Sequence, residues 1–109
     1  MIFLKDFNID EAREILSSHN PEDLKIISHM EERWVVREFD INYIVNCLLN
    51  EIPLSISKTM PNRFKLIYPH RTRKTKDWYV IIEIGDDEIV SIITAYSEDK
   101  ARRKHERKY

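Results

Sequence analysis

Residues 78–95 read WYVIIEIGDDEIVSIITA, two apolar runs separated by Gly85-Asp86-Asp87. Both runs are rich in β-branched and aromatic residues, which favour strands, and the Gly-Asp-Asp link has the composition of a hairpin turn. Neither run alternates strictly between apolar and polar residues, as is typical of strands with little exposed surface. Residues 78–84 and 89–95 are therefore predicted to be the central strands of an antiparallel sheet.

The region upstream of this hairpin has the two-residue period of half-buried strands. Residues 63–68 place Phe, Leu and Tyr at every second position, and residues 54–57 alternate Leu and Ile with Ser. Side chains on a strand point alternately to the two faces of a sheet. We expect two further strands joined around Pro61-Asn62, and hence a meander of about four antiparallel strands.

The N-terminal half has the 3.6-residue period of helices instead. Asn8 and Glu11 have the spacing of a capping box, and a short helix is expected after them. Asn20-Pro21 marks a second helix start, and this helix either continues to about Arg37 or breaks at Ser28. A third helix is expected after Asp40, over the apolar residues of 41–49. The predicted fold is α+β, with two to three N-terminal helices on one face of a roughly four-stranded antiparallel sheet.

The length and composition indicate one domain. The chain has 109 residues, one cysteine and no Gly/Ser-rich linker, so a single core is expected over residues 1–109. The apolar runs are far shorter than the roughly 20 residues of a membrane helix, and the lone Cys47 suggests a reducing compartment. We expect a cytoplasmic protein with no membrane partner, ending in a basic, helical tail over residues 97–109.

The formal net charge of −1 conceals a strong segregation of charge along the chain. Residues 1–52 carry five Lys/Arg and eleven Asp/Glu, a net charge of −6, whereas residues 63–76 carry six Lys/Arg and no acid. Residues 98–109 carry six Lys/Arg and three Asp/Glu. The near-neutral total therefore does not exclude a polyanion such as RNA. The alternative interpretation of each basic block is a solvated surface, or pairing with the acidic block of another copy in a homodimer.

One of the four histidines lies in a pattern of its own. His29, Arg33 and Arg37 are spaced i, i+4, i+8, which places them on one face of a helix. A histidine can exchange protons near neutral pH without a large pKa shift, and arginines can bind phosphate. The alternative is a solvent-facing polar stripe, with Arg33 paired to a neighbouring carboxylate. From spacing alone, both interpretations stay open.

These residues, with Ile27-Ser28 directly before His29, resemble a small family of uncharacterised domains. The resemblance also includes the expected helix near 41–49, the strand at 64–67 and the hairpin end at 92–96. That family is grouped with the RelE-like and colicin-D-like toxins of the barnase–EndoU–colicin–RelE fold group. The similarity covers residues 26–96, which leaves residues 1–25 as an N-terminal helical extension and 97–109 as the tail.

The resemblance implies a ribonuclease of toxin–antitoxin type that cleaves RNA without a metal ion or cofactor. Its expected partners are RNA, including ribosome-bound mRNA, and an antitoxin protein. The implied catalytic residues are His29 as acid or base, Arg33 as a phosphate clamp and Tyr96 for orientation or proton transfer. Expected RNA contacts are Arg37, Arg63, Lys65, His70, Arg71, Arg73, Lys74 and Lys76. Tyr96 could equally be a packed strand-end aromatic, and a non-catalytic binding module is the alternative function.

Overall fold

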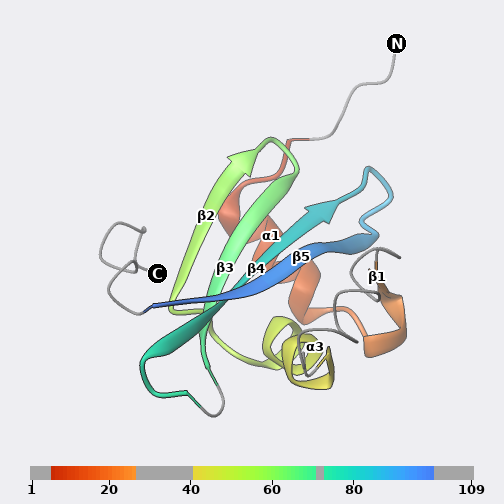
Figure 1. Ribbon diagram of the computed structural model, residues 1–109. Coiled ribbons are helices and arrows are strands. Elements are labelled where there is room, and N and C mark those ends of the chain that lie inside the picture. The colour runs from red at the N-terminus through yellow and green to blue at the C-terminus, as the bar shows by residue number, and fades with distance from the viewer. Residues whose placement is uncertain (1–5, 27–40, 71–72, 100–109) are drawn as a thin grey trace.

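The computed structural model describes residues 6–26, 41–70 and 73–99, and these ranges form two α-helices, one short 3-10 helix and five strands. The elements (Figure 1) are α1 (Ile9–Ser17), η1 (Pro21–Asp23), β1 (Leu24–Ile26), α3 (Ile41–Asn50), β2 (Ser55–Met60), β3 (Arg63–Pro69), β4 (Lys76–Ile84) and β5 (Val90–Asp99). The α+β class is confirmed. Neither described helix combines the length and apolar character needed to cross a membrane.

Helix α1 begins at the capping box predicted from its sequence. The backbone N–H of Glu11 donates to the Asn8 side chain at 2.8 Å, and the Glu11 carboxylate accepts from the Asn8 N–H at 3.1 Å. The helix buries Ala12, Ile15 and Leu16 against the sheet and α3. Since the box satisfies two backbone donors that have no partner within the helix, it fixes where α1 starts.

The sheet has the strand order β1-β5-β4-β3-β2, with β1 parallel to β5 and every other pair antiparallel. The predicted four-strand meander is therefore present as β2 to β5. The structure differs in detail from the expected sheet of roughly four antiparallel strands, because Leu24–Ile26 adds a fifth, parallel strand by pairing with Val90–Ile92. The same residues were expected within the second helix. Pairing with a distant strand overrides local helix signals, and residues 27–37 of that expected helix lie outside the described residues.

Strand β5 is longer than predicted. It continues past Ala95 to Asp99, so the expected helical tail does not begin at Ser97. Strand β4 begins at Lys76 and pairs with the extra residues of β5 up to Asp99. The Lys76 ammonium and the Asp99 carboxylate lie 2.8 Å apart across this end of the hairpin. The remainder of the tail, residues 100–109, is outside the described part of the chain.

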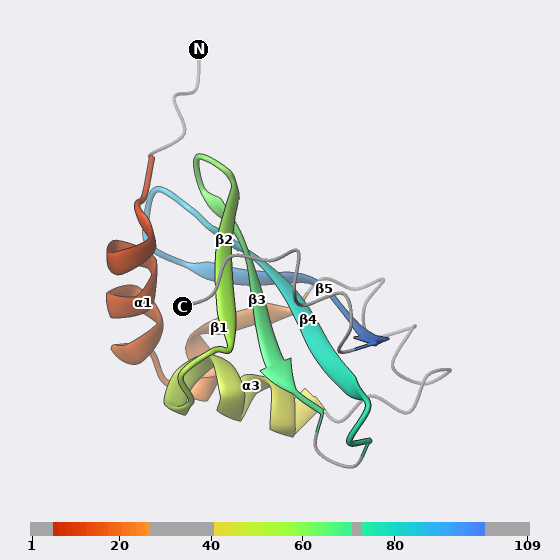
Figure 2. The same cartoon turned by 90° about the vertical axis from the view of Figure 1, so that its left-hand side faces the viewer.

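The two faces of the sheet carry different side chains. On the helix face, α1 and α3 (Figure 2) cover a core that includes Phe64, Leu66, Val80 and Ile82. The alternate positions form the opposite face, which we call the second face. The β4–β5 pair has a bulge: Ile81 pairs with Thr94 and Ile82 with Ile92, so Ile93 is an extra residue in β5. Because of this extra residue, Thr94 lies on the second face and Ile92 on the helix face. The residues that the register assigns to the second face are Lys25, Ser55, Ser57, Met60, Arg63, Lys65, Ile67, Pro69, Asp77, Tyr79, Ile81, Glu83, Ser91, Thr94, Tyr96 and Glu98.

Candidate functional site

Two of the predicted site residues, Lys65 and Tyr96, come together on the second face through a third residue. Tyr79 lies between them on the central strand: the Lys65 ammonium is 5.7 Å from the centroid of its ring. The rings of Tyr79 and Tyr96 are 5.4 Å apart between centroids and tilted by 37°. Strands β3, β4 and β5 thus contribute one residue each to a row that we call the Lys65 cluster.

Register explains why these three side chains meet. Tyr79 pairs directly with Tyr96, so their rings are cross-strand neighbours. Lys65 pairs with Ile81, two residues along β4 from Tyr79, and its long side chain covers that diagonal distance. Because pairing between strands is not visible in the sequence, Tyr79 was not predicted to belong to the site. Its place at every second position of an apolar run was the one signal available.

The Lys65 cluster combines burial with polarity. Tyr79 is 3% exposed, whereas Lys65 and Tyr96 are half-buried and lie to either side of it. A cation over an aromatic face is attracted by the ring's negative potential, and this attraction grows as water is excluded. The cluster therefore holds an ammonium group and a phenol close together on one surface.

Two other predicted phosphate contacts are engaged in ion pairs. The Arg63 guanidinium lies 2.9 Å from the Glu83 carboxylate on β4, and Asn62 donates to the other oxygen of that carboxylate at 3.4 Å. Lys76 pairs with Asp99 as described above. Both pairs reduce the positive charge that these residues offer to a polyanion.

The basic loop after β3 has a defined internal structure. His70 stacks on Trp78, with ring centroids 4.8 Å apart and planes 14° from parallel. The Arg73 N–H donates to Nδ1 of His70 at 3.0 Å, which places the ring proton of the neutral form on Nε2. Tyr43 of α3 donates to the carbonyl oxygen of Pro69 at 2.7 Å. His70 therefore packs at the end of the helix face, because Trp78, on which it stacks, belongs to the core on that face.

Burial, and then the charge of Arg73, lower the pKa of His70 below its ordinary value. Both effects disfavour the imidazolium form, and so does the hydrogen bond that Nδ1 accepts. Arg73 and Lys74 of the same loop are exposed. They remain the loop residues best placed to meet a ligand from solution.

Four predicted site residues, His29, Arg33, Arg37 and Arg71, lie outside the described residues. Within the described ranges, no three His, Cys, Asp or Glu side chains gather as a metal site would require. Burial raises the pKa of the Cys47 thiol to about 11, so this thiol stays protonated near neutral pH. The chemistry described so far therefore centres on Lys65 and Tyr96.

A comparison with protein families identifies the family of the chain. The model of the MJ0788 family matches residues 10–82, from α1 to near the end of β4. This range includes Lys65 and Tyr79 and ends before Tyr96. No curated protein and no solved structure matches the chain. Since the match spans more than half of the sequence, the chain belongs to the MJ0788 family.

Proposed function

We propose that the second face binds single-stranded RNA and that the protein is a metal-independent ribonuclease of toxin type. The observation that carries the proposal is the meeting of Lys65, Tyr79 and Tyr96 on adjacent strands. An ammonium group binds phosphate as a point charge, and the half-buried ring of Tyr96 can stack with a base irrespective of sequence. Tyr79, which is 3% exposed, holds these two side chains in place rather than meeting the RNA itself. The exposed Arg73 and Lys74 would add phosphate contacts at the end of β3.

The proposed reaction is attack of the ribose 2'-hydroxyl on the adjacent phosphate. The 2'-oxygen forms a bond to phosphorus, the bond to the 5'-oxygen breaks, and the products are a 2',3'-cyclic phosphate and a free 5'-hydroxyl. This step needs a base for the 2'-proton, positive charge beside the phosphorane and a proton donor for the 5'-oxygen. Lys65 would supply the charge and Tyr96 the hydroxyl. The base would be His29, assisted by Arg33, as the family resemblance implies.

One observation favours the second candidate, an RNA-binding domain without catalysis. Arg63 and Lys76, two of the expected RNA contacts, are paired with Glu83 and Asp99. A site with fewer available cations stabilises a developing phosphorane less well, yet it can still bind RNA by stacking. The two candidates share the second face and differ in whether a bond is broken.

Binding is tested by fluorescence anisotropy of a labelled single-stranded RNA over a range of salt concentrations. Lys65→Met removes the charge and keeps an apolar side chain over Tyr79. It should weaken binding by about tenfold and reduce the slope of log affinity against log salt by about one. Lys58→Met is the matched control, because Lys58 pairs with Asp6 at the edge strand. Equal effects of both variants would overturn the assignment of RNA to the second face.

Cleavage is tested separately, by following RNA integrity in the presence of a chelator. Wild type should cleave and leave cyclic phosphate ends, while His29→Ala should lose about 100-fold or more of the rate at nearly unchanged RNA affinity. Tyr96→Phe should lower the rate while leaving binding nearly unchanged. Intact RNA that is nevertheless bound, and equal toxicity of wild type and His29→Ala in cells, would establish the second candidate instead.

If catalysis is found, co-expression with the neighbouring gene product would test for the expected antitoxin, and ribosome-bound mRNA would be the next substrate.

A further inference from the structure

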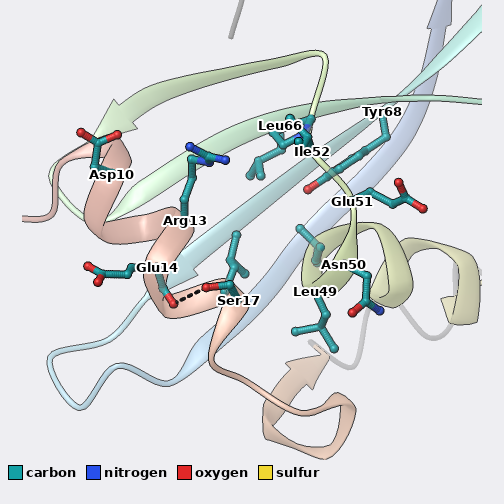
Figure 3. A pocket seen from close by; sticks show the side chains of 13 residues that line it. Asp10, Arg13, Glu14, Ser17, Leu49, Asn50, Glu51, Ile52, Leu66 and Tyr68 are labelled. Carbon is teal, nitrogen blue, oxygen red and sulfur yellow. Dashed lines mark hydrogen bonds between the residues drawn. The ribbon is translucent and has the colours of Figure 1, made fainter.

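A cavity of about 430 Å³ opens on the helix face, between α1, the C-terminal turn of α3 and strand β3 (Figure 3). It lies across the sheet from the Lys65 cluster and shares no residue with it. Its volume is within the range of small-molecule sites in proteins. The residues that line it all belong to the described part of the chain.

The inner wall of the cavity is apolar except for one hydroxyl group. Leu16, Leu48 and Leu66 contribute buried aliphatic side chains. Tyr68 is 1% exposed, and its hydroxyl points toward the cavity (Figure 3) with no hydrogen-bond partner among the described residues. A buried hydroxyl without a partner costs folding free energy, and such groups are rare in folded proteins unless a ligand or water completes them.

The rim of the cavity is acidic. Asp10 and Glu14 of α1 and Glu51 after α3 place three carboxylates at the outer rim, where they point away from the cavity (Figure 3), and the one guanidinium of the rim, that of Arg13, points toward it. The final turn of α3 also lines the cavity, and the negative end of a helix dipole favours cations. The net charge of the rim and the dipole therefore both favour a positively charged group at the outer edge of the cavity.

The ionisation of Tyr68 is consistent with this surrounding. Burial raises the pKa of its hydroxyl, and the neighbouring Cys47 and Glu51 raise it further, while Arg13 opposes them. The group therefore remains a neutral phenol that can both donate and accept a hydrogen bond. It can meet a polar atom of a ligand but offers no negative charge.

We propose that this cavity binds a small organic amine whose apolar body lies among the three leucines. The ammonium group lies at the acidic rim, near Glu51, and a hydroxyl or similar polar atom at the other end of the ligand pairs with Tyr68. This ligand class satisfies the buried hydroxyl, the apolar wall and the acidic rim together. The site is independent of RNA binding on the second face.

Charge selectivity is tested with two probes that share a phenol ring, tyramine and 4-hydroxyphenylacetate, followed by amide shifts in NMR spectra. Tyramine should shift the amides of Leu16 and Leu48 saturably with a Kd of about 1 mM or below, and the acid should bind at least about tenfold more weakly. Glu51→Gln should weaken tyramine binding by about threefold to tenfold. The control Asp86→Asn, in the turn between β4 and β5, should leave it unchanged. Absence of saturation by about 10 mM tyramine, or equal binding of the acid, would overturn the proposal.

The role of Tyr68 is tested by adding phenethylamine, which is tyramine without its hydroxyl. Wild type should prefer tyramine by about threefold to tenfold, the worth of one hydrogen bond. Tyr68→Phe should abolish that preference while still binding phenethylamine, which shows that the cavity has kept its shape. If the preference persists in Tyr68→Phe, the ligand does not pair with this hydroxyl and the proposed mode is wrong.

Discussion

The two faces of the sheet are both largely buried, yet they are built from different chemistry. On strand β3, Phe64 and Leu66 point to the helix face, while Arg63 and Lys65 point to the second face. The helix face is explained by burial of apolar surface, which drives folding. The second face also buries Ile67 and Tyr79, but it places beside them an ammonium group and an ion pair, and ion pairs contribute little net stability. Burial of apolar surface therefore explains the helix face, whereas the polar groups of the second face are the ones that the proposed RNA binding would use.

The largest change in unfolding free energy is expected from a test of this contrast at two neighbouring residues of the central strand. Ile82 is fully buried on the helix face, whereas Ile81 is half-buried on the second face. Ile82→Ala should cost about 2–5 kcal/mol of unfolding free energy, because it leaves a cavity in the core, and Ile81→Ala about 1 kcal/mol. Urea denaturation of both variants measures the difference. Equal losses would mean that the second face contributes as much to folding as the helix face.

A smaller loss of unfolding free energy is expected at the contact between the end of α1 and the turn that joins β4 and β5. The ring nitrogens of His19, at the end of α1, lie 2.6 Å from the Ile15 carbonyl oxygen and 2.9 Å from that of Glu88. Glu88 has a φ of 65°, an uncommon conformation for a residue other than glycine. This contact therefore fixes a turn that is costly on its own.

His19→Ala should lower the unfolding free energy by about 1–2 kcal/mol, since it removes both contacts. Ser17→Ala is the matched control: the Ser17 hydroxyl donates only to the Glu14 carbonyl oxygen within α1, at 2.9 Å and in solvent. It should change stability by less than about 0.5 kcal/mol. Faster amide exchange at Glu88 in His19→Ala alone would locate the effect. A loss in His19→Ala no larger than that of the control would show that the contact carries no stability.

The sequence predicted the elements whose signals are local. The hairpin at 78–95, the capping box of α1 and the helix at 41–49 depend on composition and period within each segment, and the structure contains all three. Strand β1 was missed because Leu24–Ile26 is a strand only through its pairing with β5. The same limit applies to β5, which extends to Asp99 because β4 accompanies it.

The candidate site was predictable only where its residues belong to one segment of the chain. Alternation correctly predicts that Arg63 and Lys65 share a face, but neither the Glu83 partner nor the place of Tyr79 follows from it. The cavity on the helix face had no sequence signal. Its defining feature is the hydroxyl of Tyr68, which has no hydrogen-bond partner among the residues that the structure describes, and this feature depends on how α1 and α3 pack over the sheet.

A third test compares two tyrosine hydroxyl groups on the helix side, whose removal should change the unfolding free energy in opposite directions. Tyr68→Phe removes a buried hydroxyl without a described partner, so it should leave the free protein unchanged or raise its unfolding free energy by about 1 kcal/mol. Tyr43→Phe removes a hydroxyl that donates to Pro69, so it should lower stability by about 1 kcal/mol. Urea denaturation without added ligand measures both. A clear loss in Tyr68→Phe would mean that the hydroxyl is satisfied in the free protein, and the argument for a ligand there would weaken.

The smallest expected effect concerns pH and decides to which face the basic loop belongs. Because the pKa of folded His70 is lowered, the unfolded chain binds more protons near the ordinary value of 6.5. Stability linked to this residue is therefore full above pH 6.5 and declines as the pH falls through that value toward the folded pKa. Protonation would also convert Nδ1 from an acceptor to a donor and break the bond from Arg73. His70→Phe can keep the stacking on Trp78 but cannot titrate.

The unfolding free energy of wild type should accordingly fall more than that of His70→Phe between pH 7.5 and pH 5, and the other titrating groups cancel in the difference. An NMR titration of the wild-type imidazole should give a pKa below 6.5. If RNA binding raises that pKa, His70 acts as a phosphate contact and the loop belongs functionally to the second face. If RNA leaves it unchanged, the stacking on Trp78 is structural, and the proposed RNA surface is limited to the Lys65 cluster and the exposed cations Arg73 and Lys74.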